Sequence, residues 1–290
     1  MGKLRRSMLF LPGNNERFLI RAIESEADAL ILDLEDAVIP NQKSKAREMI
    51  RHALVAVNFR GKERVVRING ITTPWWEEDL AAAVEGGTEA ILIPKADNDK
   101  IIRDVDNAVT EAECRLGVPN GQTKFMALIE TPIGLINVER TVVASPRIDA
   151  LVFGGGDYGL STRVRVTPDE LAYVYPETKI MLAARAADVM AIGTPYTHNV
   201  GDLTAVAAQA KRQRDLGLDG KAVIHPTHVT LANKAFTPSS DEIMFAQKII
   251  ASYEASGKGA ISVDGKLIEH VHVKEAHRAL VIARKAGLIQ

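Results

Sequence analysis

The sequence predicts an α/β fold, a TIM (β/α)8 barrel with a C-terminal extension, on three observations. Eight short apolar runs recur along the chain, a longer stretch with helical spacing follows each of them, and most of the runs are continuously apolar. Continuous apolarity is typical of parallel strands that are buried on both faces. A doubly wound open sheet has the same alternation with fewer strands, and it is the competing fold.

The predicted strands end in Gly, Pro or a charged residue. They occupy residues 8–12, 29–35, 64–69, 90–95, 125–130, 150–154, 189–195 and 222–225. Their spacing of roughly 20 to 40 residues leaves room for one crossover helix after each strand. Eight such units close a barrel, so we expect the catalytic domain to span residues 1–237.

Three Thr-Pro pairs mark expected helix starts, because a threonine hydroxyl can cap a helix and proline suits its first position. They are Thr73-Pro74, Thr131-Pro132 and Thr167-Pro168, and Glu170 has the spacing of a capping box with Thr167.

Residues 238–290 are not needed to close a barrel and are expected to form the extension. Ser239 with Glu242 predicts another helix start, Asp264-Gly265 predicts a two-residue hairpin, and a final helix is expected over 273–286. This tail is expected to act as a lid, as an oligomer contact, or as both.

Composition excludes several classes of protein. The 36 Lys and Arg against 37 Asp and Glu give a net charge of −1, so no excess positive charge favours nucleic acid. The single cysteine, Cys114, excludes an internal disulfide and a multi-cysteine metal site, and it fits a reducing compartment. No apolar run is long enough for a signal peptide or a membrane span. A soluble, cytoplasmic protein is expected.

The chemistry of a TIM barrel lies at the carboxyl ends of its strands. Glu130 and Asp157 follow neighbouring predicted strands, which lie about 4.8 Å apart, so their carboxylates can converge on one hard divalent cation. Mg²⁺ is the expected ion, since it takes one or two carboxylates together with waters and substrate oxygens. The competing interpretation is that both carboxylates only pair with Arg67 and Lys95.

Other polar residues stand at the same strand ends. Arg67 and Asn69, two residues apart, would present a guanidinium and an amide on one side, unless Asp33 or Glu35 pairs with the arginine. The residues 154–156 are three glycines, which fit either an anion-binding turn or simply a tight turn. Lys95 is expected to be a counter-ion among these acids, and a Schiff-base nucleophile is the alternative.

These motifs, in this order, resemble the citrate lyase β-subunit-like family, within the aldolase and citrate lyase group that includes malyl-CoA and citramalyl-CoA lyases. The resemblance runs from end to end. It rests on Arg6-Ser-Met-Leu-Phe-Leu-Pro-Gly13, Arg17-Phe-Leu19, Asp33-Leu-Glu-Asp-Ala-Val38, Arg67-Ile-Asn69, Ile93-Pro-Lys95, Ile129-Glu-Thr-Pro132, Phe153-Gly-Gly-Gly-Asp157 and Lys221-Ala-Val-Ile-His-Pro226.

The resemblance implies a homotrimer or larger homo-oligomer, in which the extension reaches over a neighbouring subunit's site. It implies that Glu130 and Asp157 hold Mg²⁺ and that Arg67 contacts the substrate carboxylate or the enolate. Further roles implied by the family are substrate binding by the Gly155-Gly156 backbone, contact of Arg17 with coenzyme A or the acyl end, and a charged shell of Asp33, Glu35, Asp36 and Lys95.

One motif departs from the family pattern. The family's tail usually reads Gly-x-Met-Ile-Asp, and its aspartate serves as the acid/base group in the neighbouring site. This chain has Gly265-Lys-Leu-Ile-Glu269, which keeps a carboxylate but lengthens its reach by roughly 1.5 Å. Glu269 is therefore the candidate acid/base residue with an altered geometry.

The activity implied is the Mg²⁺-dependent cleavage of a 3-hydroxy-3-carboxyacyl thioester, of the citramalyl-CoA or malyl-CoA type, to acetyl-CoA and a 2-keto acid. Two alternatives stay open. One is a citrate lyase β-subunit that acts on a citryl thioester carried by an acyl-carrier subunit, together with an α-subunit. The other is a weakly catalytic subunit that binds acyl-CoA or a keto acid.

Overall fold

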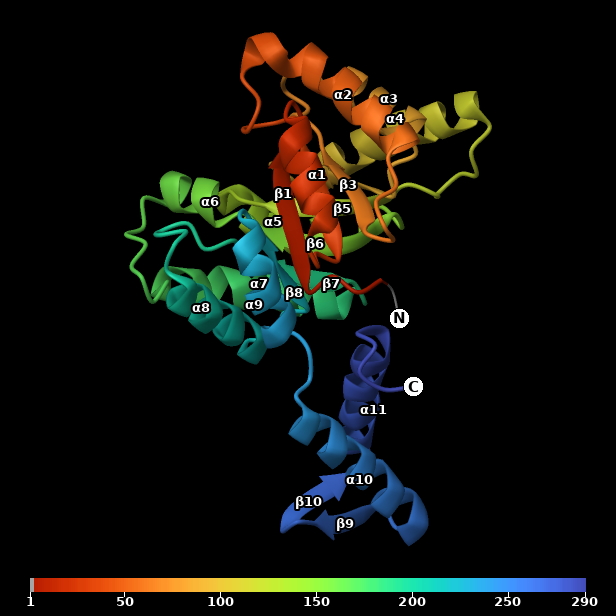
Figure 1. Ribbon diagram of the computed structural model, residues 1–290, viewed down its shortest axis with the longest axis vertical. Helices are drawn as coiled ribbons and strands as arrows, with labels where there is room; N and C mark the ends of the chain where they lie inside the picture. The colour runs from red at the N-terminus through yellow and green to blue at the C-terminus, as the bar shows by residue number, and fades with distance from the viewer. Residues whose placement is uncertain (1–2) are drawn as a thin grey trace. The chain divides into compact units, whose positions relative to one another are not determined.

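The computed structural model describes residues 3–290 and shows a closed barrel of eight parallel strands in sequence order, β1 to β8 (Figure 1). The predicted TIM barrel is confirmed, and the open sheet is excluded because β1 pairs with β8. The strands are β1 (Ser7–Pro12), β2 (Ala29–Asp33), β3 (Glu63–Arg67), β4 (Ala90–Ile93), β5 (Lys124–Ile129), β6 (Ile148–Phe153), β7 (Met190–Gly193) and β8 (Gly220–Val223).

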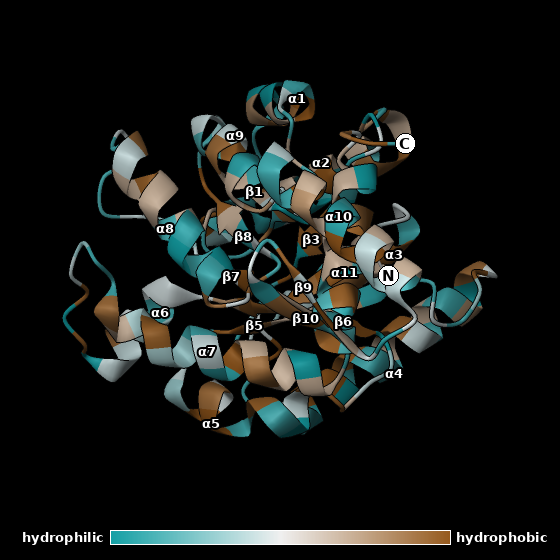
Figure 2. Ribbon diagram, turned by 90° about the horizontal axis from the view of Figure 1, so that it is seen from below, coloured by the Kyte–Doolittle hydropathy of each residue, from teal (hydrophilic) through white to brown (hydrophobic). Residues whose placement is uncertain are grey.

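The barrel strands form because their residues are apolar on both faces. Every residue of β2 and β4 is buried, as parallel strands covered by helices require. Figure 2 shows this contrast as brown strands inside the barrel and helices in which brown and teal alternate. A core cluster of side chains from seven of the eight strands includes Met8, Ile31, Leu92, Met126 and Val152.

Helices follow the strands and complete the βα units. They are α1 (Glu16–Glu24), the 3-10 helix η1 (Pro40–Gln42), α2 (Lys43–Ala56), α3 (Trp76–Glu85), α4 (Asp99–Leu116), α5 (Pro132–Thr141), α6 (Gly155–Thr162), α7 (Leu171–Ala186), α8 (Leu203–Asp215) and α9 (Pro226–Ala235).

One of the three Thr-Pro helix starts is confirmed. Thr131 caps α5, and its hydroxyl oxygen accepts from the Gly134 N–H at 2.9 Å. The other two predictions are wrong. Thr73 donates its hydroxyl to the Gly70 carbonyl, and α3 begins later, at Trp76.

The Thr167 capping box does not form, because the Glu170 side chain forms hydrogen bonds with residues of α8 instead. Its carboxylate accepts from Gln209 at 2.8 Å and from Arg212 at 2.7 Å, and its own backbone lies in the left-handed region with φ 51°. The helix α7 therefore begins after Glu170 rather than at Pro168.

The described chain divides into two compact units, Arg5–Asn233 with the barrel and a smaller one with residues 3–4 and 234–290. The smaller unit contains α10 (Ser240–Ser256), β9 (Ala260–Val263), β10 (Lys266–Glu269) and α11 (His270–Lys285). Ser239 and Glu242 form the expected capping box, and Asp264-Gly265 forms the expected hairpin turn with φ values of 50° and 77°. The hairpin packs on the two helices through a core that includes Ile249, Val263, Ile268 and Leu280.

No helix within residues 3–290 is both long and apolar enough to cross a membrane.

Candidate active site

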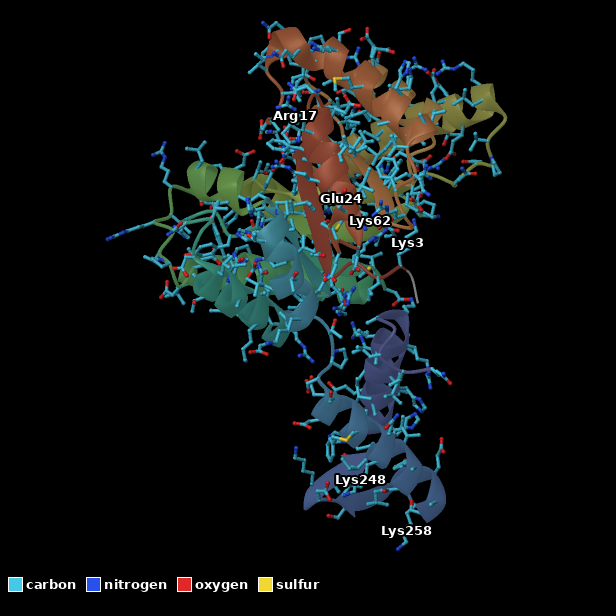
Figure 3. The ribbon with its side chains drawn as sticks, in the orientation of Figure 1. Lys3, Arg17, Glu24, Lys62, Lys248 and Lys258 are labelled. Carbon is cyan, nitrogen blue, oxygen red and sulfur yellow. The ribbon has the colours of Figure 1, made fainter. Side chains whose placement is uncertain are left out.

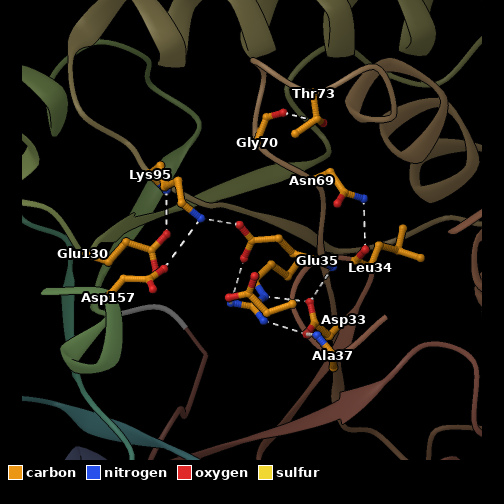
Figure 4. Close-up of polar contacts among 12 residues, drawn as sticks. Asp33, Leu34, Glu35, Ala37, Asn69, Gly70, Thr73, Lys95, Glu130 and Asp157 are labelled. Carbon is orange, nitrogen blue, oxygen red and sulfur yellow. Dashed lines mark hydrogen bonds and ion pairs between the residues drawn. The ribbon is translucent and has the colours of Figure 1, made fainter. Parts of the chain in front are cut away.

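Charged side chains follow five consecutive strands at the carboxyl end of the barrel, where they converge (Figure 4). Asp33 and Arg67 are the last residues of β2 and β3 and pair with each other in the strand register. Lys95 and Glu130 follow β4 and β5. We call this group the acid cluster; its acids are Asp33, Glu35, Asp36, Glu130 and Asp157, and its cations are Arg67 and Lys95.

Arg67 is held by a two-point contact with Asp33. Its Nε and Nη2 lie 2.6 Å from the two carboxylate oxygens of Asp33, and its Nη1 lies 3.0 Å from Glu35 Oε2. Burial lowers the pKa of Arg67, but the hydrogen bond and charge of Asp33 raise it further, so the pKa lies above its ordinary value. The guanidinium is therefore a fixed cation, already oriented by the acids that the sequence analysis named as its alternative partners.

Asn69 does not join Arg67, which corrects the expectation that both side chains face the substrate. Arg67 ends β3, and Asn69 lies beyond it, where its amide donates to the Leu34 carbonyl at 2.9 Å and to Asp79 at 2.6 Å. The strand alternation that predicts a common direction stops at the strand end.

Lys95 bridges the two sides of the acid cluster. Its ammonium nitrogen lies 2.6 Å from Glu35 Oε1 and 3.6 Å from Asp157 Oδ2, and its backbone N–H donates to Glu130 Oε1 at 2.8 Å (Figure 4). Its backbone is left-handed, with φ 47°, which is costly for a residue with a Cβ. Burial lowers its pKa, but the hydrogen bond and charge of Glu35 raise the pKa above its ordinary value. A lysine held in its charged form is a counter-ion, and this disfavours the Schiff-base alternative.

Glu130 is buried, with 3% of its surface exposed, as are Asp33 and Glu35 of the same cluster. Burial and then the charge of Glu35 raise its pKa to about 8, although the Lys95 N–H and ammonium oppose the shift. Burial also raises the pKa of Glu35. The cluster thus holds more acids than cations and would be stabilised by one more positive charge.

The residue set fits a hard divalent cation. Glu130 and Asp157 both face Lys95 from adjacent strand ends, and both offer oxygen ligands. Within residues 3–290, no three His, Cys, Asp or Glu side chains are arranged as a complete metal site. A set of two carboxylates matches the preference of Mg²⁺, which takes its remaining ligands from water and substrate oxygens, rather than that of a metal enclosed by protein ligands.

The three glycines lie at the start of the helix α6. Gly154 is the N-cap of α6, and Gly155 donates its N–H to Thr194 Oγ1 at 3.0 Å. The N–H of Gly155 is therefore already used. The N–H groups of Gly156 and Asp157 lie in the first turn of α6, where a helix supplies no acceptor, and these are the donors available to an anion.

Arg17 and Asp36 lie outside the centre of the cluster, and Glu269 belongs to the smaller unit. Arg17 is exposed in the first turn of α1, after β1 (Figure 3), and none of the described contacts joins it to the acids. Asp36 is 64% exposed and 4.0 Å from Arg67 Nη1. Glu269 is exposed in the smaller unit, at the N-cap of α11.

The sequence analysis missed Thr194 and Tyr173. Thr194 follows β7 directly, at the same barrel end as the other polar residues, so the rule that identified them could also have identified it. Tyr173 had no such signal, because it stands in the middle of an apolar helical run.

The raised pKa of Glu130 predicts a pH dependence for the metal-free protein. A carboxyl whose pKa is higher in the folded state stabilises the fold at low pH, and this stability is lost as the pH rises through about 8. In EDTA, we expect the melting temperature of the wild type to fall relative to that of Glu130→Gln by about 5 °C between pH 5.5 and pH 9. Parallel melting curves for the two proteins, recorded by calorimetry across this range, would contradict the assignment of a raised pKa.

Comparison with known proteins agrees with the fold and the motifs. Residues 6–226 match the family model of the HpcH/HpaI aldolase/citrate lyase family. The citrate lyase subunit beta of Leuconostoc mesenteroides subsp. cremoris is 34% identical over 290 residues, which cover 99% of this chain and 96% of that protein. A (3S)-malyl-CoA thioesterase of Cereibacter sphaeroides is 37% identical over 281 residues, 96% of this chain and 94% of that protein.

A solved structure with the same fold is the protein CitE from Mycobacterium tuberculosis, in complex with magnesium, acetoacetate and coenzyme A. It is 23% identical, with a TM-score of 0.79 and coverage of 97% of each chain. The barrel, the order of the motifs and the end-to-end identity with the two relatives agree, and the resemblance found in the sequence is confirmed. The chain belongs to the HpcH/HpaI aldolase/citrate lyase family.

Proposed function

We propose that the chain is a Mg²⁺-dependent carbon–carbon lyase that cleaves a 3-hydroxy-3-carboxyacyl-CoA thioester, of the citramalyl-CoA or malyl-CoA type, to acetyl-CoA and a 2-keto acid. The observation that carries the proposal is the acid cluster, in which Glu130 and Asp157 flank Lys95 with an excess of negative charge. The relatives named citrate lyase subunit beta and (3S)-malyl-CoA thioesterase support the substrate class.

Glu130 and Asp157 would hold the ion. When bound, Mg²⁺ would polarise the substrate's hydroxyl and carboxylate oxygens. The N–H groups of Gly156 and Asp157 would bind the substrate carboxylate at the start of α6. Arg17, exposed beside the carboxyl end of β1, would contact the coenzyme A portion.

The proposed chemistry is a retro-Claisen cleavage. A base takes the proton of the C3 hydroxyl, the bond between C2 and C3 breaks, and its electron pair passes to the thioester to form an enolate while C3 becomes the keto carbon. Arg67, fixed by Asp33, would stabilise the enolate oxygen. Protonation of the enolate carbon then gives acetyl-CoA. The charges of Asp33, Glu35, Asp36 and Lys95 would keep Arg67 and Asp157 in place.

Glu269 of a neighbouring chain is the proposed acid/base residue, with the extension as lid and oligomer contact. Glu269→Gln keeps the size of the side chain but cannot take a proton, and we expect it to lower kcat by about 10² to 10⁴-fold. Glu269→Asp should retain most of the activity if only the carboxylate matters. An unchanged kcat in Glu269→Gln, measured at saturating substrate, would remove Glu269 from the mechanism.

The substrate is tested with a panel of citramalyl-, malyl-, β-methylmalyl- and citryl-CoA thioesters, assayed with Mg²⁺ and with EDTA. We expect Mg²⁺-dependent release of acetyl-CoA with pyruvate or glyoxylate. Turnover only of a citryl thioester on an acyl carrier protein would instead identify a citrate lyase β-subunit. Tight acyl-CoA or keto-acid binding without turnover would identify a binding subunit.

Thioester hydrolysis is the second candidate, because a relative at 37% identity is named (3S)-malyl-CoA thioesterase. In that case the malyl-CoA assay would release free malate and coenzyme A without glyoxylate. The two outcomes differ in which bond breaks, so product analysis separates them.

A further inference from the structure

Gly155, at the start of α6, is held from two sides by buried residues that the proposed chemistry does not use. Its N–H donates to Thr194 Oγ1 at 3.0 Å, and its carbonyl accepts the Tyr173 hydroxyl at 2.7 Å. Thr194 is 2% exposed and Tyr173 is 5% exposed. The N–H and the carbonyl of Gly155 are thus hydrogen-bonded to two different elements, the N–H to the end of β7 and the carbonyl to the helix α7.

Two of the three glycines, Gly154 and Gly155, are closely packed, with no room for a Cβ. A Cβ on Gly155 would lie 2.8 Å from Thr194 Oγ1 and 3.0 Å from the Tyr173 ring. A Cβ on Gly154 would lie 2.5 Å from the Cβ of Glu130. Gly154 is therefore packed against Glu130, and Gly155 is packed against Thr194 and Tyr173.

Thr194 and Tyr173 are themselves fixed by the buried framework. The Thr194 carbonyl accepts from Gln213 Nε2 at 3.1 Å, and the same nitrogen donates to Glu177 at 2.6 Å. Gln213 and Glu177 have no exposed surface. The Tyr173 ring packs edge-on against Phe153, the last residue of β6, with ring centres 5.2 Å apart. Both side chains that contact Gly155 are thus held by buried neighbours.

We propose that Thr194 and Tyr173 are positioning residues that set the first turn of α6 by clamping Gly155. The clamp fixes the direction of the Gly156 and Asp157 N–H groups and the position of the Asp157 carboxylate opposite Lys95. This inference rests on the proposed function for its catalytic consequence, but the clamp itself is a property of the folded chain. Neither residue contacts the reacting atoms.

The test compares Thr194→Val, Thr194→Ser and Tyr173→Phe with the control Thr88→Val. Valine has the shape of threonine but no acceptor, whereas serine keeps the acceptor. Thr88 is 3% exposed, and its buried hydroxyl shares its one proton between the Arg64 and Ala90 carbonyl oxygens, which lie 3.0 and 2.9 Å away. It precedes β4, at the opposite end of the barrel from the acid cluster.

Two measurements are made on the full-length protein. Hydrogen exchange, followed by mass spectrometry without ligand, reports on the segment 155–162. We expect Thr194→Val and Tyr173→Phe to raise its exchange rate by about tenfold, because each variant loses one buried hydrogen bond. Calorimetric titration with pyruvate in the presence of Mg²⁺ should show about tenfold weaker binding in the same variants. Thr194→Ser and Thr88→Val should match the wild type in both measurements.

The outcomes separate the clamp from the proposed function. Unchanged exchange in Thr194→Val and Tyr173→Phe would overturn the clamp, whatever the binding data show. Raised exchange with unchanged pyruvate affinity would overturn the positioning role. If the wild type binds neither pyruvate nor the panel thioesters, the proposed function fails, and the exchange data alone still decide whether Thr194 and Tyr173 hold α6.

Discussion

Glu130→Gln is expected to abolish Mg²⁺-dependent turnover while the barrel stays folded. Glutamine has nearly the same size, so it fits the space beside Gly154 and can still accept the Lys95 N–H. It lacks the charge that a hard cation requires. Metal polarisation is worth several kcal/mol of transition-state stabilisation, which corresponds to a fall of about 10³-fold in kcat/KM. Steady-state kinetics against Mg²⁺ concentration measures this loss.

A matched control separates the metal site from a general effect of charge. Glu89→Gln removes a carboxylate just before β4, at the other end of the barrel, where Glu89 pairs with Arg64 at 3.2 Å. We expect its activity to stay within a factor of about two of the wild type, since surface ion pairs contribute little. Full activity in Glu130→Gln, or an equal loss in Glu89→Gln, would contradict the assignment of Glu130 to the metal.

Arg67→Lys is expected to lower kcat by about 10² to 10³-fold, as the loss of one preorganised donor to a developing oxyanion does. Lysine keeps the positive charge between Asp33 and Glu35, so the acids stay neutralised. It cannot reproduce the two-point contact with Asp33 at 2.6 Å, and therefore its ammonium is not fixed in the same direction. The effect should fall on kcat more than on KM, because the enolate charge exists only after bond cleavage.

Arg64→Lys on the same strand is the control, because Arg64 is 30% exposed and pairs with Glu89. A purely structural role for Arg67 predicts a different result, in which Arg67→Lys lowers the melting temperature and leaves kcat unchanged. Calorimetry and saturation kinetics on both variants decide between the two roles. An equal loss of kcat in Arg64→Lys and Arg67→Lys would contradict a specific role of Arg67 at the enolate.

Much of the barrel could be read from local patterns. Each of the eight strands overlaps a predicted run, and most of these runs are continuously apolar, as a parallel strand covered on both faces requires. The hairpin at Asp264-Gly265 and the capping box at Ser239 are also confirmed, since both depend on backbone and side chains within four residues. The candidate residues at the barrel rim followed from one rule, which places function at the carboxyl ends of barrel strands, whereas Arg17 and Glu269 came only from the family resemblance.

Local rules were wrong where a distant partner competed for the same side chain. Thr167 and Glu170 have the spacing of a capping box, but Gln209 and Arg212, about forty positions further along the chain, take the Glu170 carboxylate. Asn69 likewise turns to Asp79 rather than to the side of Arg67. A rule based on sequence spacing alone does not account for distant residues that compete for the same side chain.

The sequence by itself determined the barrel, the strand ends and the types of charged residue that stand there. Only the tertiary structure decided which of them meet: Lys95 with Glu35, 60 residues away, and Gly155 with Thr194, 39 residues away. The physical reason is that strand formation depends on the hydropathy of neighbouring residues, whereas pairing, burial and pKa depend on closure of the barrel. Closure brings charges from five strands together, with Asp33, Glu35 and Glu130 buried among them, and there the charge state of each group depends on its neighbours.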